Sequence, residues 1–119
     1  MTKTKLVMSG LVRPLIEPRL PDWIERHFFM SKEEALTLAP QAEIGWFDMY
    51  DKDDMATVIN AATNMKWLNS IYAGVDGMPL AQLKAQGCVV TNGAGINAVT
   101  IAEYVVMAML TVAKNYREV

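Results

Sequence analysis

The stretch Trp67-Leu68-Asn69-Ser70-Ile71-Tyr72-Ala73-Gly74-Val75-Asp76-Gly77 opens with residues that suit a buried strand and closes on a glycine-flanked turn. Pro79 then starts a short helical run through Leu83, because proline is tolerated where a helix does not use its first N–H. In open α/β folds such a turn lies at the carboxyl edge of the sheet, where ligands bind. Gly74 lacks a Cβ, so a carboxylate or phosphate could reach the backbone N–H groups. Taken alone, this turn is more simply explained as an ordinary strand-to-helix connection.

Composition excludes several classes of protein. The 119 residues are one domain's worth, and an apolar share of 52% excludes disorder. The net charge is −2 and no basic run is present, which argues against nucleic-acid binding. Cys88 is the only cysteine, so no internal disulfide can form and a reducing compartment fits best. The three-residue apolar run Leu6-Val7-Met8 is too short for a signal peptide. We therefore expect a cytoplasmic protein that binds neither nucleic acid nor membrane.

Short apolar strand candidates alternate with helix candidates along the chain. Ser31, followed three residues later by Glu34, forms a capping-box pattern that predicts a helix over 31–38. Pro18 and Pro21 argue against a long helix in the segment 15–24. The alternation implies a parallel sheet wrapped by helices, and we predict a flavodoxin-like, doubly wound α/β fold. Strands are expected over 5–9, 28–30, 43–48, 67–72 and 88–91, and further helices over 55–62 and 79–83.

Three aspartates, Asp51, Asp53 and Asp54, stand just before the helix expected over 55–62. Aspartate is favoured there because it caps the helix and interacts with the helix dipole. No complete calcium-loop pattern follows. We therefore predict a capped helix start and no metal site.

A glycine-rich segment, 92–98, leads from the last expected strand into the last helix. Gly93, Gly95 and Ala98 formally satisfy the dinucleotide fingerprint Gly-x-Gly-x-x-Gly/Ala. That fingerprint also needs a following strand and an acidic residue about twenty positions on. Only Glu118, in the last residues of the sequence, falls near that distance, so we do not assign a pyrophosphate loop here.

The last expected helix, from about Ala98 to Asn115, is apolar on nearly every face. Between Ala98 and Ala113 the polar residues are Thr100, Glu103 and Thr111. The run is too short for a membrane span and contains a carboxylate, so it must be buried in protein. One small sheet can cover one side of it. The apolar surface on the other side would stay exposed, which predicts an interface with a second domain, a second subunit, or both.

Two separated motifs carry a resemblance to a known family. Tyr72-Ala73-Gly74-Val75-Asp76, together with Asn97-Ala98-Val99-Thr100-Ile101-Ala102-Glu103-Tyr104, resembles the D-isomer-specific 2-hydroxyacid dehydrogenases. The intervening Leu83–Asn92 segment is also similar, and the resemblance is strongest from about 65 to 110. In that family an amino-terminal, flavodoxin-like substrate domain is interrupted by a Rossmann domain that binds NAD or NADP. The resemblance thus implies a partial substrate-binding domain over 1–97, an interdomain helix and tail over 98–119, and an absent Rossmann cofactor domain.

The resemblance also implies roles for individual residues. The turn is expected to offer the backbone N–H groups of Ala73, Gly74 and Val75 to the carboxylate of a 2-oxo or 2-hydroxy acid. Further along, Asn97 would brace the loop, Thr100 would lie near the nicotinamide end of the cofactor, and Glu103 would be a structural carboxylate behind the site. A carboxylate in an apolar helix needs a partner, and Glu103 stands near the positive N-terminal end of its helix.

The chain departs from the family in its catalytic residues. The family's hydride transfer needs a cofactor domain, an arginine for the substrate carboxylate and a carboxylate-assisted histidine, and no catalytic residue is assigned here. The single histidine, His27, precedes all relevant motifs and is more simply a surface or strand-edge residue. We therefore predict a substrate-domain fragment of an NAD(P)-dependent D-2-hydroxyacid dehydrogenase, inactive alone and binding no cofactor tightly by itself. The 98–115 helix would meet the missing cofactor domain or a second subunit, giving a homodimer.

Two other readings remain open. One is a stand-alone module that senses a small carboxylate, and the other is an oligomerisation domain that pairs through its last helix. The motif from Asn97 to Glu103 favours the dehydrogenase. The short length of the sequence favours the other two if Val119 is a natural end.

Overall fold

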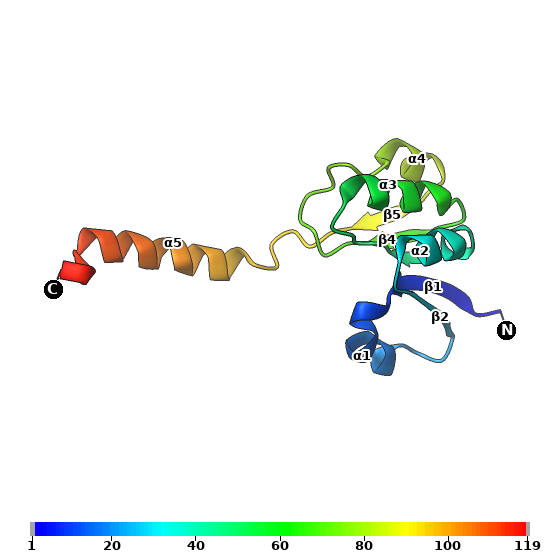
Figure 1. Cartoon of the computed structure of the whole chain (residues 1–119), viewed down its shortest axis with the longest axis horizontal. Coiled ribbons are helices and arrows are strands. Elements are labelled where there is room, and N and C mark those ends of the chain that lie inside the picture. Colours follow the sequence, from blue (N-terminus) through cyan, green and yellow to red (C-terminus); the bar gives the residue numbers. More distant parts are fainter. Residues whose placement is uncertain (1, 119) are drawn as a thin grey trace.

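The computed structural model describes residues 2–118 and contains one five-stranded, all-parallel sheet. The strand order is β2-β1-β3-β4-β5, which is the order of flavodoxin-like doubly wound folds. The α/β class and the parallel sheet predicted from the sequence are confirmed (Figure 1). The strands are β1 (Thr4–Ser9), β2 (Ile24–Phe29), β3 (Ile44–Trp46), β4 (Trp67–Asn69) and β5 (Val89–Thr91).

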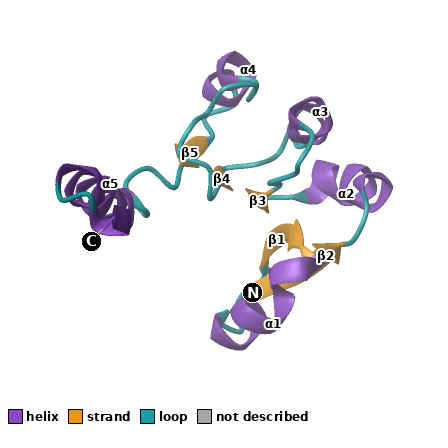
Figure 2. Ribbon diagram, turned by 60° about the vertical axis from the view of Figure 1, so that its left-hand side comes forward, coloured by secondary structure: helices purple, strands orange, loops and turns teal. Residues whose placement is uncertain are grey.

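Helices cover the two faces of this sheet unequally (Figure 2). On one face lie α2 (Lys32–Leu38), α3 (Lys52–Ala61) and α4 (Leu80–Ala85), over the main core around Val7, Phe47 and Leu68. On the other face lies α1 (Arg13–Ile16), with short 3-10 turns before and after it. A smaller cluster, which includes Met8 and Ile24, packs beneath it. The expected absence of a long helix around Pro18 and Pro21 is confirmed, because only single turns form there.

Two helix starts follow the local signals in the sequence. The Ser31 side chain accepts a hydrogen bond from the Glu34 N–H at 3.2 Å, as the capping-box pattern predicts. The Asp51 carboxylate accepts from the N–H groups of Asp53 and Asp54 at 2.9 and 3.0 Å and so caps α3. Asp51, just before α3, and Asp53 and Asp54, in its first turn, thus belong to the helix start.

Three strands differ clearly in length from the prediction. β3 is expected over 43–48 but spans only Ile44–Trp46. β2 was expected over 28–30 but pairs with β1 along its whole length, from Thr4 opposite Ile24 to Ser9 opposite Phe29. Its polar residues fit because β2 is an edge strand with half-buried side chains. β4 is expected to run to Tyr72 but ends at Asn69. Beyond it the Ser70 N–H donates to the Thr91 carbonyl of β5, whereas the Ile71 N–H donates to the Asp48 carboxylate.

The last helix, α5 (Ala98–Ala113), has 16 residues and projects away from the sheet (Figure 1). It ends two residues before the expected Asn115, since Asn115 adopts a left-handed φ of 49°, a conformation that commonly terminates helices. The expectation that the sheet covers one side of this helix is wrong: none of its residues is buried. The radius of gyration is 18.8 Å, against about 13.5 Å for a compact domain of this length. No helix within residues 2–118 is long and apolar enough to cross a membrane.

Candidate functional site

The loop after β4, which we call the carboxylate loop (residues 70–76), lies at the carboxyl edge of the sheet, and Asp48 anchors its first residues. The Asp48 carboxylate accepts hydrogen bonds from Ser70 Oγ at 2.6 Å and from the Ile71 N–H at 2.7 Å. It also accepts from Trp46 Nε1 at 2.6 Å. Ser70 is buried, and its Oγ accepts from the Tyr72 N–H at 3.1 Å. Asp48 therefore joins the end of β3 to the end of β4.

The segment after β5 holds the loop from its other side. Asn92 Nδ2 donates to the Ala73 carbonyl at 2.8 Å, and the Gly93 N–H donates to the Tyr72 carbonyl at 3.0 Å. A Cβ on Gly93 would lie 2.0 Å from the carbonyl oxygen of Ile71, so only glycine permits this close approach. The loop is thus fixed between the ends of β3 and β5.

Among the described residues, the five consecutive amides of residues 73–77 have no hydrogen-bond partner, and Ala73, Gly74 and Val75 come first in this run. Ala73 and Gly74 are exposed and Val75 is half-buried. The Val75 carbonyl accepts from the Met78 N–H at 3.1 Å, which closes the turn before α4. Consecutive free amides in a turn can form a concave site for an anion.

Gly74 is not required by the backbone conformation. Its φ is not in the left-handed region, and a Cβ there would contact only the Asp76 carboxylate, at 3.2 Å. A flexible side chain can yield at that distance. The absence of a side chain at Gly74 therefore leaves the amides open to a ligand rather than relieving backbone strain.

The other residues singled out from the sequence lie apart from the carboxylate loop. Asn97 precedes α5 and its side chain makes no capping hydrogen bond, whereas the side chain that braces the loop is that of Asn92. Thr100 and Glu103 are exposed on α5. His27 lies on the edge strand β2 and pairs with Glu25 at 2.7 Å. The roles expected for Asn97, Thr100 and Glu103 stay predictions.

Four backbone amides of the 92–98 segment are engaged within the chain, which argues against a dinucleotide site there. The Gly93 amide is used by Tyr72, and the Ala94 amide donates to Asn92 Oδ1 at 3.3 Å. The Ile96 and Ala98 amides donate to carbonyls within the segment itself. A pyrophosphate loop needs such amides free and aimed at the ligand. The glycines of this segment serve chain packing and turning instead.

Sequence reasoning missed the residues that hold the loop. Asp48 was placed only as the last residue of a strand, and Asn92 only as part of a glycine-rich segment. Polar residues directly after parallel strands gather at one edge of the sheet. Applied to Asp48 and Asn92, this rule places both residues near the carboxylate loop.

The fold defines an α/β domain of the doubly wound class, with free loop amides at the carboxyl ends of its strands. A family model described as "D-isomer specific 2-hydroxyacid dehydrogenase, catalytic domain" matches residues 6–117. The chain belongs to this family, and the resemblance noted in its two motifs is confirmed.

Relatives agree with this assignment. D-3-phosphoglycerate dehydrogenase from Archaeoglobus fulgidus is 34% identical over 85 residues, which cover 71% of this chain and 16% of that protein. A D-isomer specific 2-hydroxyacid dehydrogenase family protein from Aeromonas salmonicida has a similar structure, with a TM-score of 0.69 and 23% identity, over 99% of this chain and 39% of that one. NAD-dependent formate dehydrogenase from Staphylococcus aureus, solved in complex with NAD, aligns with a TM-score of 0.61 and 21% identity over 97% of this chain. This chain spans about 40% of that structure's length.

Proposed function

We propose that this chain is the substrate-binding part of an NAD(P)-dependent D-2-hydroxyacid dehydrogenase. The observation that carries the proposal is the row of unpaired amides at Ala73, Gly74 and Val75. These three N–H groups would bind the carboxylate of a 2-oxo or 2-hydroxy acid. The family membership and the position of the loop at the carboxyl edge of the sheet support this assignment.

Rigid anchoring makes the loop suited to this task. Asp48 holds the Ser70–Ile71 end, while Asn92 and Gly93 hold the Tyr72–Ala73 end. Because the loop is already ordered, its N–H donors can bind a carboxylate without the entropy loss of ordering a flexible loop. Hydrogen bonds to a charged acceptor are also stronger than those between neutral groups.

The chemistry itself would belong to the whole protein. NAD or NADP would supply or accept the hydride when bound, as the complex of the Staphylococcus aureus relative with NAD suggests. The 92–98 segment does not fit the cofactor, and His27 is not at the carboxylate loop. The role of the residues in this chain is therefore to bind and orient the acid, and we do not assign them a proton-transfer step.

Amide NMR tests the carboxylate site directly. Adding glyoxylate, pyruvate or hydroxypyruvate to the chain should shift the amide signals of Ala73, Gly74 and Val75, with saturation in the millimolar range. Pyruvamide, which lacks the charge, should leave them in place. The variant Gly74→Ala tests the same site, because it should fold normally but bind the acids more weakly than the wild type. Unchanged loop signals at millimolar acid would contradict the proposal.

We also infer that α5 is an interface between two copies of the chain. Most of its exposed side chains are apolar, among them Val99, Val106 and Leu110, and its polar residues are Thr100, Glu103 and Thr111. A hollow along α5 is bounded by this helix and by Lys114 and Tyr116 just beyond it, and no residue of the sheet lines it. Its lining is mostly apolar, with Glu103, Thr111 and Lys114 as the polar members. Faces of this kind on a protein in water mark interaction surfaces. Sedimentation of the chain should show a dimer, and a stable monomer at micromolar concentration would contradict this inference.

A further inference from the structure

A groove of about 380 Å³ opens at the same sheet edge, next to the carboxylate loop. The chain segments that follow β1, β2, β3 and β4 form its walls, and Ile71 and Tyr72 of the loop line one side. Its volume lies within the range of about 300–1,000 Å³ that is usual for small-molecule pockets. Ala73, Gly74 and Val75 do not line the groove themselves, but they follow Tyr72 directly in the chain, so the remaining atoms of an acid held by their amides could extend past Tyr72 into it.

The walls of the groove are mostly apolar. Leu11, Phe29, Met30, Met49 and Ile71 all line it. The Tyr72 hydroxyl donates a hydrogen bond to the Met49 carbonyl at 3.1 Å, so its proton is not free to bind a substrate. The Ser31 hydroxyl is engaged as the cap of α2. Apart from the Tyr50 hydroxyl and the charged Lys32 and Asp48, the groove thus offers a substrate chiefly hydrocarbon contacts.

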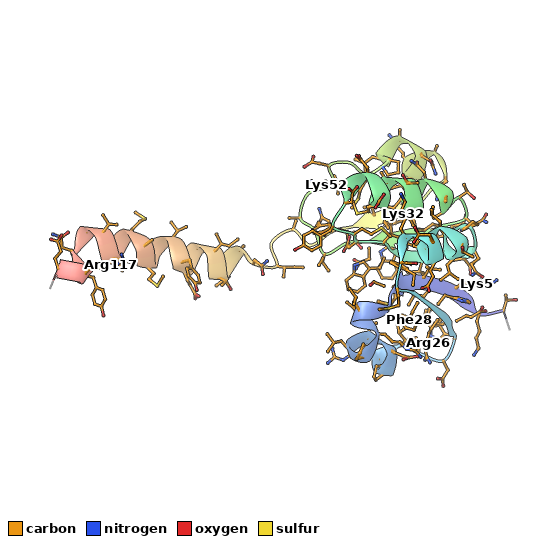
Figure 3. All side chains as sticks on the ribbon, in the orientation of Figure 1. Lys5, Arg26, Phe28, Lys32, Lys52 and Arg117 are labelled. Carbon is orange, nitrogen blue, oxygen red and sulfur yellow. The ribbon has the colours of Figure 1, made fainter. Side chains whose placement is uncertain are left out.

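The charges in the groove disfavour a second anionic group on the substrate. Among the described residues that line it, Lys32 is the one cation, and its Nζ lies 2.5 Å from Asp54 Oδ1 (Lys32 is labelled in Figure 3). Asp48 also lines the groove with its negative charge. Phosphate groups are bound by arginine, lysine or free N–H groups. A lysine already paired with a carboxylate, beside a further carboxylate, is a poor phosphate site.

We propose that the groove selects 2-oxo and 2-hydroxy acids with an uncharged, apolar side chain over phosphorylated ones. This rests on the proposed function, because the carboxylate of the same molecule is held by the amides of the carboxylate loop. The preference would set this chain apart from the relative named for 3-phosphoglycerate.

A series of acids of increasing length tests the proposal. Glyoxylate, pyruvate, 2-oxobutyrate, 2-oxovalerate and 4-methyl-2-oxovalerate are titrated into the chain, and amide signals of Ala73–Val75 and methyl signals of Leu11 and Met49 are followed. Each added methylene that enters the groove should tighten binding about two- to fourfold. Phosphohydroxypyruvate should bind no more tightly than pyruvate.

The outcomes separate the two proposals. If no acid shifts the loop amides, the carboxylate site itself is wrong. If the loop amides shift but affinity does not increase with chain length, or if phosphohydroxypyruvate binds most tightly, the carboxylate site stands and the apolar selectivity is overturned. Tighter binding of the longer acids with shifts at Leu11 and Met49 supports both.

Two pairs of variants locate the selectivity in the groove. Leu11→Glu places a charge in the groove on a side chain that is 78% exposed, so folding is not at risk, and it should abolish the length dependence. Leu15→Glu, at a residue 69% exposed and outside the groove lining, should preserve it. Equal effects of the two variants would overturn the proposal.

The second pair tests the charge argument. Asp54→Asn releases Lys32 and should tighten phosphohydroxypyruvate binding about fivefold, the size expected for one charge-assisted contact at a partly exposed site. Asp53→Asn, in the same first turn of α3, is the control and should change nothing. An Asp54→Asn variant that binds phosphohydroxypyruvate no better than the wild type would show that pairing does not neutralise Lys32.

Discussion

Replacing Gly93 by alanine tests whether close packing between two chain segments holds the carboxylate loop. A Cβ at this position would lie 2.0 Å from the Ile71 carbonyl oxygen and 2.7 Å from its carbonyl carbon. Ordinary contact between carbon atoms needs about 3.5 Å, so the two backbones must separate by about 1 Å or more. That movement would break the 3.0 Å hydrogen bond from the Gly93 N–H to the Tyr72 carbonyl.

Overpacking of this kind costs about 1–3 kcal/mol, and the lost hydrogen bond adds about 1 kcal/mol. We expect the free energy of unfolding to fall by about 2–4 kcal/mol, which lowers the melting temperature by about 10–20 °C for a folded part of this size. Tryptophan fluorescence is the appropriate signal, because Trp23, Trp46 and Trp67 all lie in the sheet domain and α5 contains no tryptophan.

Gly74→Ala is the control for this experiment. Its Cβ would touch only the flexible Asp76 carboxylate, at 3.2 Å, so its melting temperature should stay within about 3 °C of the wild type, equivalent to less than about 1 kcal/mol. Gly93→Ala should also lose the acid-dependent shifts of the loop amides. A Gly93→Ala variant that melts within about 3 °C of the wild type would refute the packing argument.

Three further predictions concern Asp48, Cys88 and α5. Asp48→Ala removes the acceptor of three hydrogen bonds and should lower the free energy of unfolding by about 2–4 kcal/mol in a denaturant titration, whereas Asp48→Asn should retain more than half of that stability, because its amide can still bond to Ser70. Burial raises the pKa of the Cys88 thiol, so less thiolate is present at pH 8 than in a free cysteine. Iodoacetamide should therefore alkylate Cys88 more slowly than it alkylates glutathione, and the rate should still increase from pH 8 to 9.5. A rate that reaches its plateau below pH 8 would contradict this. A chain ending at Asn97 should melt within about 3 °C of the full chain, because α5 buries no residue, but it should no longer dimerise.

Features set by a few neighbouring residues could be predicted from the sequence. The Ser31 and Asp51 caps, the single turns around the prolines and the alternation of strands with helices all depend on contacts within one turn of chain. The same is true of the glycine turn that places Ala73, Gly74 and Val75 after a strand. The fold class follows from these local features, since alternating strands and helices close into a parallel sheet.

Features set by distant contacts could not be predicted in the same way. The extra length of β2 comes from pairing with β1, and its Glu25-Arg26-His27 run lacks the apolar character of a strand. Asp48 bonds to Ser70 and Ile71, which are 22 and 23 residues away. Asn92 reaches Ala73 across 19 residues. Each of these contacts requires the sheet order to be known before the partner can be named.

The carboxylate loop and α5 are separate parts of the molecule. Asp48, Asn92 and Gly93, which hold the carboxylate loop, lie in the sheet domain. Neither the loop amides nor the groove uses a residue of α5. α5 is largely apolar and none of its residues is buried, which is the basis of the interface inferred above. Because the two surfaces share no residue, changes on α5 should alter assembly without altering the intrinsic affinity of the loop for a carboxylate.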